Sequence, residues 1–215
     1  MNDRDIHQAI RILRREVRRW NKPIVGHYKN NPFTVLISCV LSLRTQDKTT
    51  EGASKRLFAQ AETPQVMTAL PVKTIEKLIY PVGFYRTKAK NIKEICRILL
   101  EQYQGKAPDE IDELMKLPGV GRKTANLVVT LGYGKPGICV DTHVHRISNR
   151  WGYVKTKTPE ETEMALRRKL PKQYWIKIND LLVAYGQNLC KPVSPLCSRC
   201  RLRPYCARRG VEKSR

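Results

Sequence analysis

Residues 117–125 of the chain read LPGVGRKTA and join two segments of helical periodicity. The two glycines bracket a single valine, so the backbone can turn tightly and bring its N–H groups close to an anion where the next helix begins. A turn of this kind binds phosphate without reading base sequence. An ordinary helix–helix turn is the alternative. Because Arg122 and Lys123 follow directly, we interpret the segment as a phosphate-binding hairpin.

Lys123 lies in the first turn of the second helix, which is an unusual place for a cation. The positive end of the helix dipole and the neighbouring Arg122 both favour its neutral amine. A neutral amine beside a DNA backbone can attack an electrophilic sugar carbon and form a Schiff base. A carboxylate, Asp141, follows 18 residues later in VDTHVHR, where a helix begins. Asp141 is therefore a candidate N-cap as well as a candidate catalytic group, and the two roles are compatible.

The charge of the chain indicates a polyanionic partner. Its 215 residues include 41 Lys and Arg against 19 Asp and Glu, which gives a net charge of +22. Half of that surplus lies in residues 167–215, where 13 cations face only two acids. A hydrophobic content of 41% excludes a disordered basic tail. No apolar run is long enough for a membrane span or a signal peptide, so we expect a cytoplasmic, nucleoid-associated protein.

The seven cysteines fall into two groups. Cys39, Cys96 and Cys139 each stand alone in an apolar run, which is typical of a buried, inert thiol. The other four are spaced C-x6-C-x2-C-x5-C and are Cys190, Cys197, Cys200 and Cys206. Four thiolates this close suit one tetrahedral metal centre or one iron–sulfur cluster. Structural zinc sites more often combine two C-x-x-C turns, and the single one here favours iron–sulfur.

The apolar periodicity is helical along nearly the whole chain and predicts a compact all-α fold. The helices are expected near residues 4–20, 33–43, 47–60, 64–69, 73–79, 86–103, 109–117, 122–132, 142–150, 159–169 and 174–188. Residues 134–137, GKPG, are the best candidate for a domain boundary.

Three motifs together carry a family resemblance. LPGVGRKTAN, VDTHVHRISNR and the four spaced cysteines occur in an order that closely resembles the endonuclease III family of helix-hairpin-helix DNA glycosylases. FTVLISCVLS, PVGFYRTKAKNI and AYGQNLC are also similar to family segments, so the resemblance covers nearly the whole chain.

The resemblance implies a two-lobed fold. Residues 25–135 would form a six-helix barrel that contains the helix-hairpin-helix at about 109–132. Residues 1–24 and 136–215 would form a lobe that holds a [4Fe–4S] cluster on the four cysteines, with DNA crossing the groove between the lobes. A monomer acting on double-stranded DNA is expected.

The resemblance also implies an enzyme of base excision repair. It would remove oxidised pyrimidines with Lys123 as nucleophile and Asp141 as the assisting carboxylate, and then cleave the backbone 3′ to the abasic site by β-elimination. The damaged nucleotide must be extruded from the duplex for this chemistry. Arg44 and Phe84 match the positions whose side chains fill the gap, although glutamine and leucine are the residues expected there.

The remaining candidates for DNA contact are the hairpin residues and one histidine: Gly119, Val120, Gly121, Arg122, Thr124 and His143. His143 and His145 with Asp141 could also be taken for a metal site, but a spacing of two places the histidines on divergent helix faces. Two alternative functions stay open. One is a related glycosylase for alkylated or mismatched bases, and the other is a non-catalytic iron–sulfur module that binds DNA.

Overall fold

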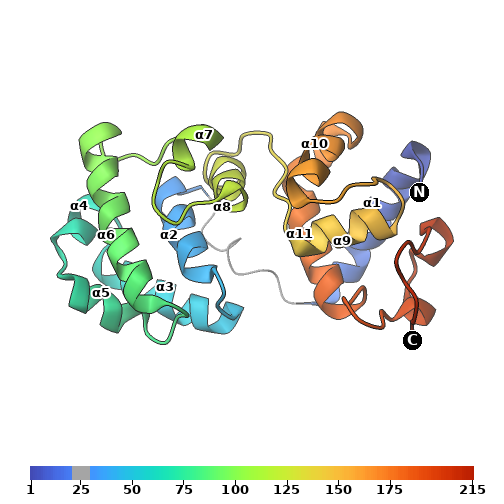
Figure 1. The fold of residues 1–215 in the computed structure, drawn as a ribbon, viewed down its shortest axis with the longest axis horizontal. Coiled ribbons are helices and arrows are strands. Elements are labelled where there is room, and N and C mark those ends of the chain that lie inside the picture. Colours follow the sequence, from blue (N-terminus) through green and yellow to red (C-terminus); the bar gives the residue numbers. More distant parts are fainter. Residues whose placement is uncertain (21–29) are drawn as a thin grey trace. The chain divides into compact units, whose positions relative to one another are not determined.

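The computed structural model describes residues 1–20 and 30–215, which form helices and turns without a β-strand. This confirms the all-α prediction. The chain divides into two units (Figure 1). The hairpin unit is Ile24–Lys135, and the cysteine unit combines Met1–Pro23 with Pro136–Arg215. None of the described helices is long and apolar enough to cross a membrane.

The hairpin unit is built around one apolar helix. Its helices are α2 (Pro32–Ser42), α3 (Asp47–Gln60), α4 (Pro64–Ala69), α5 (Val72–Ile79), α6 (Tyr85–Gln102), α7 (Ile111–Leu114) and α8 (Arg122–Leu127), followed by a π-helical turn, η3 (Val128–Gly132). Every residue of α2 from Phe33 to Leu41 is buried. A helix that is apolar on all sides must be covered on all sides, and α3, α6, α8 and η3 all contact α2.

Short polar caps begin several of these helices where the sequence predicts. The Asn31 side chain accepts hydrogen bonds from the backbone N–H groups of Phe33 and Thr34, with Pro32 in the first turn. The Thr63 hydroxyl caps α4 in the same way. Side-chain caps satisfy backbone donors that a helix leaves unpaired.

Two predicted helices are wrong in extent. The helix expected at 109–117 is only α7, because the chain already turns at Met115–Leu117 to enter the hairpin. The helix expected at 122–132 changes from α to π at Val128. Its last residue, Gly132, lies so close to α2 that a Cβ there would stand 2.7 Å from the Pro32 Cα. The wider turn thus ends in tight contact with α2.

The cysteine unit brings the N-terminal helix onto the C-terminal half of the chain. It consists of α1 (Asp3–Glu16), η1 (Val17–Arg19), α9 (Thr142–Arg150), α10 (Pro159–Lys169), η4 (Lys172–Tyr174), α11 (Trp175–Asn188), η5 (Cys197–Arg199) and η6 (Arg203–Tyr205). The apolar residues Ile6, Ile10 and Leu13 of α1 are buried and share one core with α9 and α11.

Candidate functional site

The hairpin turn places its two glycines in different conformations. Gly119 has a φ of +76°, a region that side chains rarely adopt. Gly121 is the N-cap of α8 with a φ of −96°, and a Cβ added there meets nothing within 4 Å. The fold therefore requires glycine at position 119 and would accept alanine at position 121. The absence of a side chain at Gly121 leaves the start of α8 open to a close ligand.

The other hairpin residues divide between surface and core. Val120 and Thr124 are buried, so their side chains belong to the packing of the unit. Lys123 is exposed in the first turn of α8. Cys39, at the centre of α2, lies within electrostatic reach of it: burial raises the pKa of the Cys39 thiol to about 12, and Lys123 acts in the opposite direction. The helix that carries Lys123, α8, packs against the buried helix α2, whereas Lys123 itself is exposed.

Asp141 is the N-cap of α9. Its Oδ1 accepts hydrogen bonds from the backbone N–H groups of His143 and Val144, both at 2.9 Å. Both cap bonds use the same oxygen, and the Oδ2 of this partly exposed residue makes no hydrogen bond to the described residues. One carboxylate can therefore cap the helix and still offer an oxygen to a reaction. Lys123 and Asp141 belong to different units.

His143 lies against Arg146 and Gly186. The Arg146 Nη2 is 3.0 Å from His143 Nδ1 and donates a second hydrogen bond of 2.9 Å to the Cys190 carbonyl. A guanidinium can only donate, so His143 Nδ1 is the acceptor of this hydrogen bond. A Cβ at Gly186 would stand 2.3 Å from His143 Nδ1, which explains a glycine inside α11. The sequence shows this glycine in AYGQNLC but not its partner.

Hydrogen bonds reach the sulfurs of three of the four spaced cysteines. The Tyr185 hydroxyl is 3.1 Å from Cys200 Sγ, the Arg150 Nη1 is 3.5 Å from Cys190 Sγ, and the backbone N–H of Arg208 is 3.4 Å from Cys206 Sγ. All four cysteines are partly buried. Among the described residues, no three His, Cys, Asp or Glu side chains are arranged to hold a single metal ion as they stand.

Cys200 and Cys206 lie within electrostatic reach of the other spaced thiols. Burial raises the pKa of both, and negative charge on Cys190 and Cys197 raises both further. Hydrogen bonds act in the opposite direction, chiefly from Tyr185 to Cys200 and from the backbone of Arg208 to Cys206. Bound cations would replace the repulsion between thiolates by attraction. The donor set of four soft thiolates with N–H and O–H donors around them fits an iron–sulfur cluster.

Arg150 fixes the segment that begins with the first of these cysteines. Its guanidinium is buried and donates hydrogen bonds of 2.6 Å to the carbonyls of both Lys191 and Pro192. Arg146, one helical turn earlier on α9, holds the Cys190 carbonyl. Neither arginine is evident as a site residue from the sequence, because only the folded chain brings α9 to the end of α11.

Arg44 and Phe84 lie together in the hairpin unit. Both are exposed, and the Arg44 Cζ is 5.8 Å from the centroid of the Phe84 ring. The two loops that carry them are joined by Lys88, whose ammonium is buried among backbone carbonyls. Burial lowers the pKa of Lys88 to about 8. Sequence reasoning proposed the first two residues separately and did not identify Lys88.

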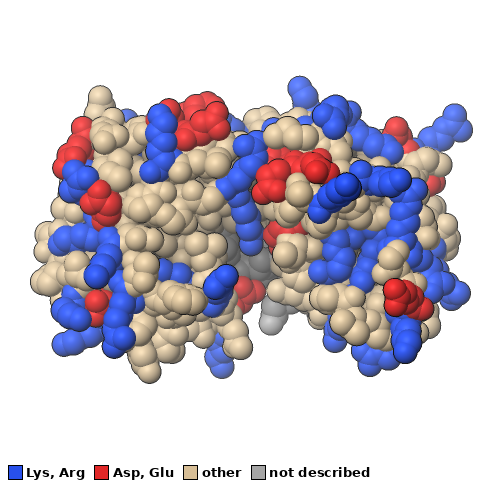
Figure 2. Space-filling model, in the orientation of Figure 1, with Lys and Arg blue, Asp and Glu red and all other residues tan. Residues whose placement is uncertain are grey.

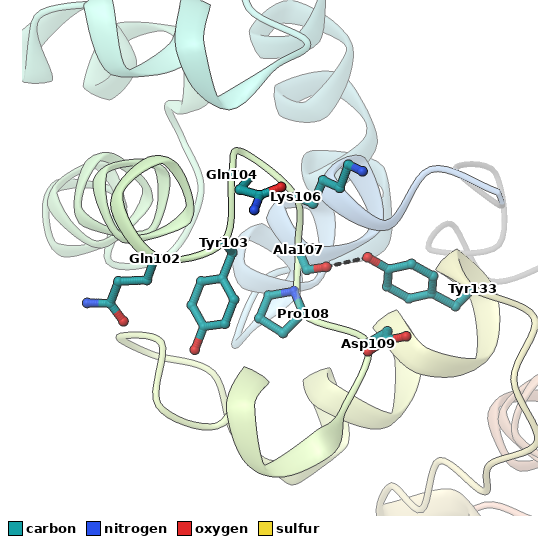
Figure 3. A pocket seen from close by; sticks show the side chains of 8 residues that line it. All are labelled: Gln102, Tyr103, Gln104, Lys106, Ala107, Pro108, Asp109 and Tyr133. Atoms are coloured by element: carbon teal, nitrogen blue, oxygen red, sulfur yellow. Dashed lines mark hydrogen bonds between the residues drawn. The ribbon is translucent and has the colours of Figure 1, made fainter.

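One hollow beside the hairpin is lined by none of the predicted site residues. In Figure 3 it lies between the end of α6 and η3, where the Tyr133 hydroxyl donates a hydrogen bond to the Ala107 carbonyl. Its volume is about 350 Å³, and its lining residues are Gln102, Tyr103, Gln104, Lys106, Ala107, Pro108, Asp109 and Tyr133. Lys and Arg side chains are widely spread over the surface of both units (Figure 2).

Comparison with known proteins identifies the same relatives by sequence and by structure. Residues 37–172 match the model of the HhH-GPD superfamily of base excision DNA repair proteins. Endonuclease III of Thermotoga maritima is 54% identical over 181 residues, which cover 84% of this chain and 85% of the relative. The chain spans 48% of the length of each of two chloroplastic endonuclease III homologues of Arabidopsis thaliana.

Two solved structures of endonuclease III with DNA share the fold and 37% of the sequence. A non-covalent complex matches with a TM-score of 0.85 over 96% of this chain and 95% of that chain. A trapped covalent intermediate, an estranged-adenine complex, matches with a TM-score of 0.84 over 96% of both chains.

Replacing Gly186 by alanine is expected to destabilise the protein, since the new Cβ would displace the His143 ring. Overpacking of this kind costs about 1–3 kcal/mol, which exceeds the gain in helix propensity. The matched control is Gly52→Ala in α3, where a Cβ meets only the flexible Arg56 guanidinium at 3.4 Å. That variant should gain up to about 1 kcal/mol. Thermal unfolding of both variants measures the difference, and shifts of the same sign would contradict the packing described.

Proposed function

The chain belongs to the HhH-GPD superfamily of base excision DNA repair proteins and is a DNA glycosylase with abasic-site lyase activity; we propose that its substrates are oxidised pyrimidines in duplex DNA. The observation that carries the proposal is Lys123, exposed at the start of a helix that the hairpin opens, in a chain similar to endonuclease III over 84% of its length. The matches to endonuclease III do not favour a non-catalytic module or a glycosylase for other bases.

Lys123 is proposed to supply the nucleophile. Its neutral amine attacks C1′ of the damaged nucleotide, and the glycosidic bond breaks as the base leaves with the electron pair and gains a proton. Opening of the sugar ring gives a Schiff base between Lys123 and C1′. Loss of a proton from C2′ then breaks the C3′–O bond, which cleaves the strand on the 3′ side.

Asp141 is proposed to accept the proton of the attacking amine and to stabilise positive charge on the sugar. The cap geometry suits this role, because Oδ1 is held by two backbone N–H groups while Oδ2 keeps its lone pairs. Fixing the carboxylate on a helix terminus lowers the cost of placing it in the reaction.

The hairpin and the cysteine loops are proposed to bind the DNA backbone. Gly121 lets phosphate approach the first turn of α8, beside Arg122. The exposed cations of the cysteine loops are Lys191, Arg199, Arg201 and Arg203. His143, in the first turn of α9, is proposed as a further contact.

The four spaced cysteines are proposed to hold a [4Fe–4S] cluster with a structural role. When bound, the cluster would cross-link the chain on either side of η5 and η6 and so stiffen the loops that carry the cations. Tyr185 and Arg150 then act as hydrogen-bond donors to ligand sulfurs. Rigid loops present their charges to phosphate with little ordering cost.

A duplex that carries thymine glycol tests the enzyme directly. Wild-type protein should be trapped covalently on it by borohydride, and Lys123→Ala should not. Lys123→Arg keeps the positive charge but cannot supply a neutral amine. It should therefore bind the duplex within roughly threefold of wild type, under 1 kcal/mol, and still fail to trap.

Lys77→Arg, on the exposed side of α5, is the matched control and should trap like wild type. Full trapping by Lys123→Ala would remove the assignment of the nucleophile. Processing confined to duplexes with alkylated purines or mismatches would overturn the proposed substrate class.

Gly121→Ala separates the effect of this position on DNA binding from its effect on stability. No atom lies within 4 Å of the new Cβ, so the melting temperature should be unchanged. Affinity for duplex DNA should fall about tenfold, because the methyl group keeps phosphate from the backbone. Gly119→Ala should instead lower stability by about 1–2 kcal/mol through its positive φ. Fluorescence anisotropy and thermal unfolding measure the two effects, and wild-type affinity of Gly121→Ala would argue against backbone contact there.

Cys200→Ser tests the metal centre. Purified wild-type protein should be yellow-brown and contain iron and sulfide, and the variant should lose most of both because one ligand sulfur is missing. Cys96→Ala removes a buried thiol of α6 and should keep the colour. Visible absorption with iron, sulfide and zinc analysis decides the outcome, and a colourless protein containing zinc would contradict the cluster.

A further inference from the structure

Two large side chains of the hairpin unit stand on left-handed backbone at the junction of α2 and α6. Arg44, just after α2, has a φ of 52°, and Phe84, the N-cap of α6, has a φ of 57°. This conformation costs an L residue about 1–2 kcal/mol. Neither residue is of the types that adopt it readily, so the surrounding contacts must hold both in place.

Lys88 provides the contacts on the α2 side. Its side chain is 6% exposed, and its Nζ donates hydrogen bonds to the carbonyls of Leu41 at 2.8 Å and Leu43 at 2.5 Å. A third hydrogen bond of 3.2 Å reaches the Thr45 hydroxyl. Lys88 is therefore a cation at the C-terminal end of α2, which the helix dipole and the unpaired carbonyls both favour.

Thr45 extends this network to the loop before Phe84. Its hydroxyl donates to the Leu43 carbonyl at 3.2 Å and accepts from the Gly83 backbone N–H at 3.2 Å as well as from Lys88. A hydroxyl has one donor and two acceptor positions, so all of them are used. A Cβ at Gly83 would stand 2.7 Å from the Arg44 carbonyl oxygen. The backbone at Arg44 and the backbone just before Phe84 are therefore in close contact.

The side chains themselves contribute little to this fold. Phe84 is 63% exposed, and the Arg44 Cζ stands 5.8 Å from its ring centroid. A cation–π contact at an exposed site is worth about 0.5–1 kcal/mol, less than the cost of the two backbone conformations. Duplex DNA can provide contacts for both side chains, since apolar wedges enter between base steps and arginine binds base edges or phosphates.

We propose that Lys88 is the positioning residue that holds Arg44 and Phe84, the side chains expected to fill the gap in damaged duplex DNA, as one stacked wedge whose two members act jointly. The proposal rests on the proposed function, because extruding a nucleotide is what leaves a gap for a wedge. It adds that the two side chains act jointly and that a buried lysine, which touches no DNA, controls them.

Joint action predicts that the losses are not additive. The probe is a duplex with a tetrahydrofuran abasic-site analogue, on which Lys123 chemistry cannot proceed. The measured quantity is the ratio of its affinity to that of the same duplex without damage. Arg44→Ala and Phe84→Ala should each lower this preference about tenfold, and the double variant should lower it no further. A loss of about a hundredfold in the double variant would mean that the two side chains act independently.

Lys88→Met keeps the side-chain stem and removes the ammonium. It should lower the preference as much as the double variant does, leave binding to undamaged duplex unchanged, and have no further effect when added to the double variant. Lys88→Arg, which retains a cation, should restore part of the preference. The matched control is Lys90→Met on the same helix, an exposed lysine that should behave as wild type.

A second variant, Thr45→Val, keeps the test decisive if Lys88→Met does not fold. It removes the hydroxyl that joins the two loops and should also lower the preference. A folded Lys88→Met or Thr45→Val protein with wild-type preference would overturn the positioning role. Wild-type protein without any preference for the damaged duplex would instead overturn the proposed function itself, and the wedge with it.

Discussion

Cations bound to backbone carbonyls close the ends of helices in both units. The carbonyls belong to residues at or just beyond the C-termini of α2, α4, α5, α9 and α11, where a helix leaves acceptors unpaired. The cations are Arg56, Lys88 and Lys93 in the hairpin unit and Arg146, Arg150 and Lys169 in the cysteine unit. With 41 Lys and Arg to 19 Asp and Glu, the chain has too few carboxylates to pair every cation. Carbonyls take their place, and the loops that carry the candidate site depend on them.

Within the cysteine unit this interaction connects two parts of the proposed chemistry. Asp141 begins α9, and Arg146 and Arg150 on the same helix hold the carbonyls of Cys190–Pro192. A buried guanidinium that loses its acceptors is costly, so the segment that starts the cysteine motif and the helix that carries the carboxylate must keep their arrangement together. A cluster on the cysteines can therefore influence Asp141 through structure alone, without taking part in the reaction.

The sequence predicts helices well where a capping residue marks the start. Residues 142–150 and 159–169 were expected as helices and are helices, because Asp141 and Thr158 cap them. The π-helical turn that ends at Gly132 could not be predicted, since it depends on contacts with α2. The same holds for Lys88, Arg146 and Arg150. A lysine among other lysines carries no signal of burial until the fold places it beneath a helix end.

The candidate residues found from the sequence differ in whether the structure itself explains the residue type at each position. Gly119 is explained by its own backbone, and Gly186 by the histidine that lies over it. Gly121, by contrast, has an ordinary φ and empty space around it. Arg44 and Phe84 have strained backbones, and their exposed side chains contribute little stability to the fold. Features that the fold explains belong to stability, whereas those that it leaves unexplained lie where the molecule meets its ligand. Two such features of the hairpin unit are the bare start of α8 and the stacked pair held by Lys88. The proposed binding of duplex DNA would account for both, through phosphate in one case and through the gap left by an extruded nucleotide in the other.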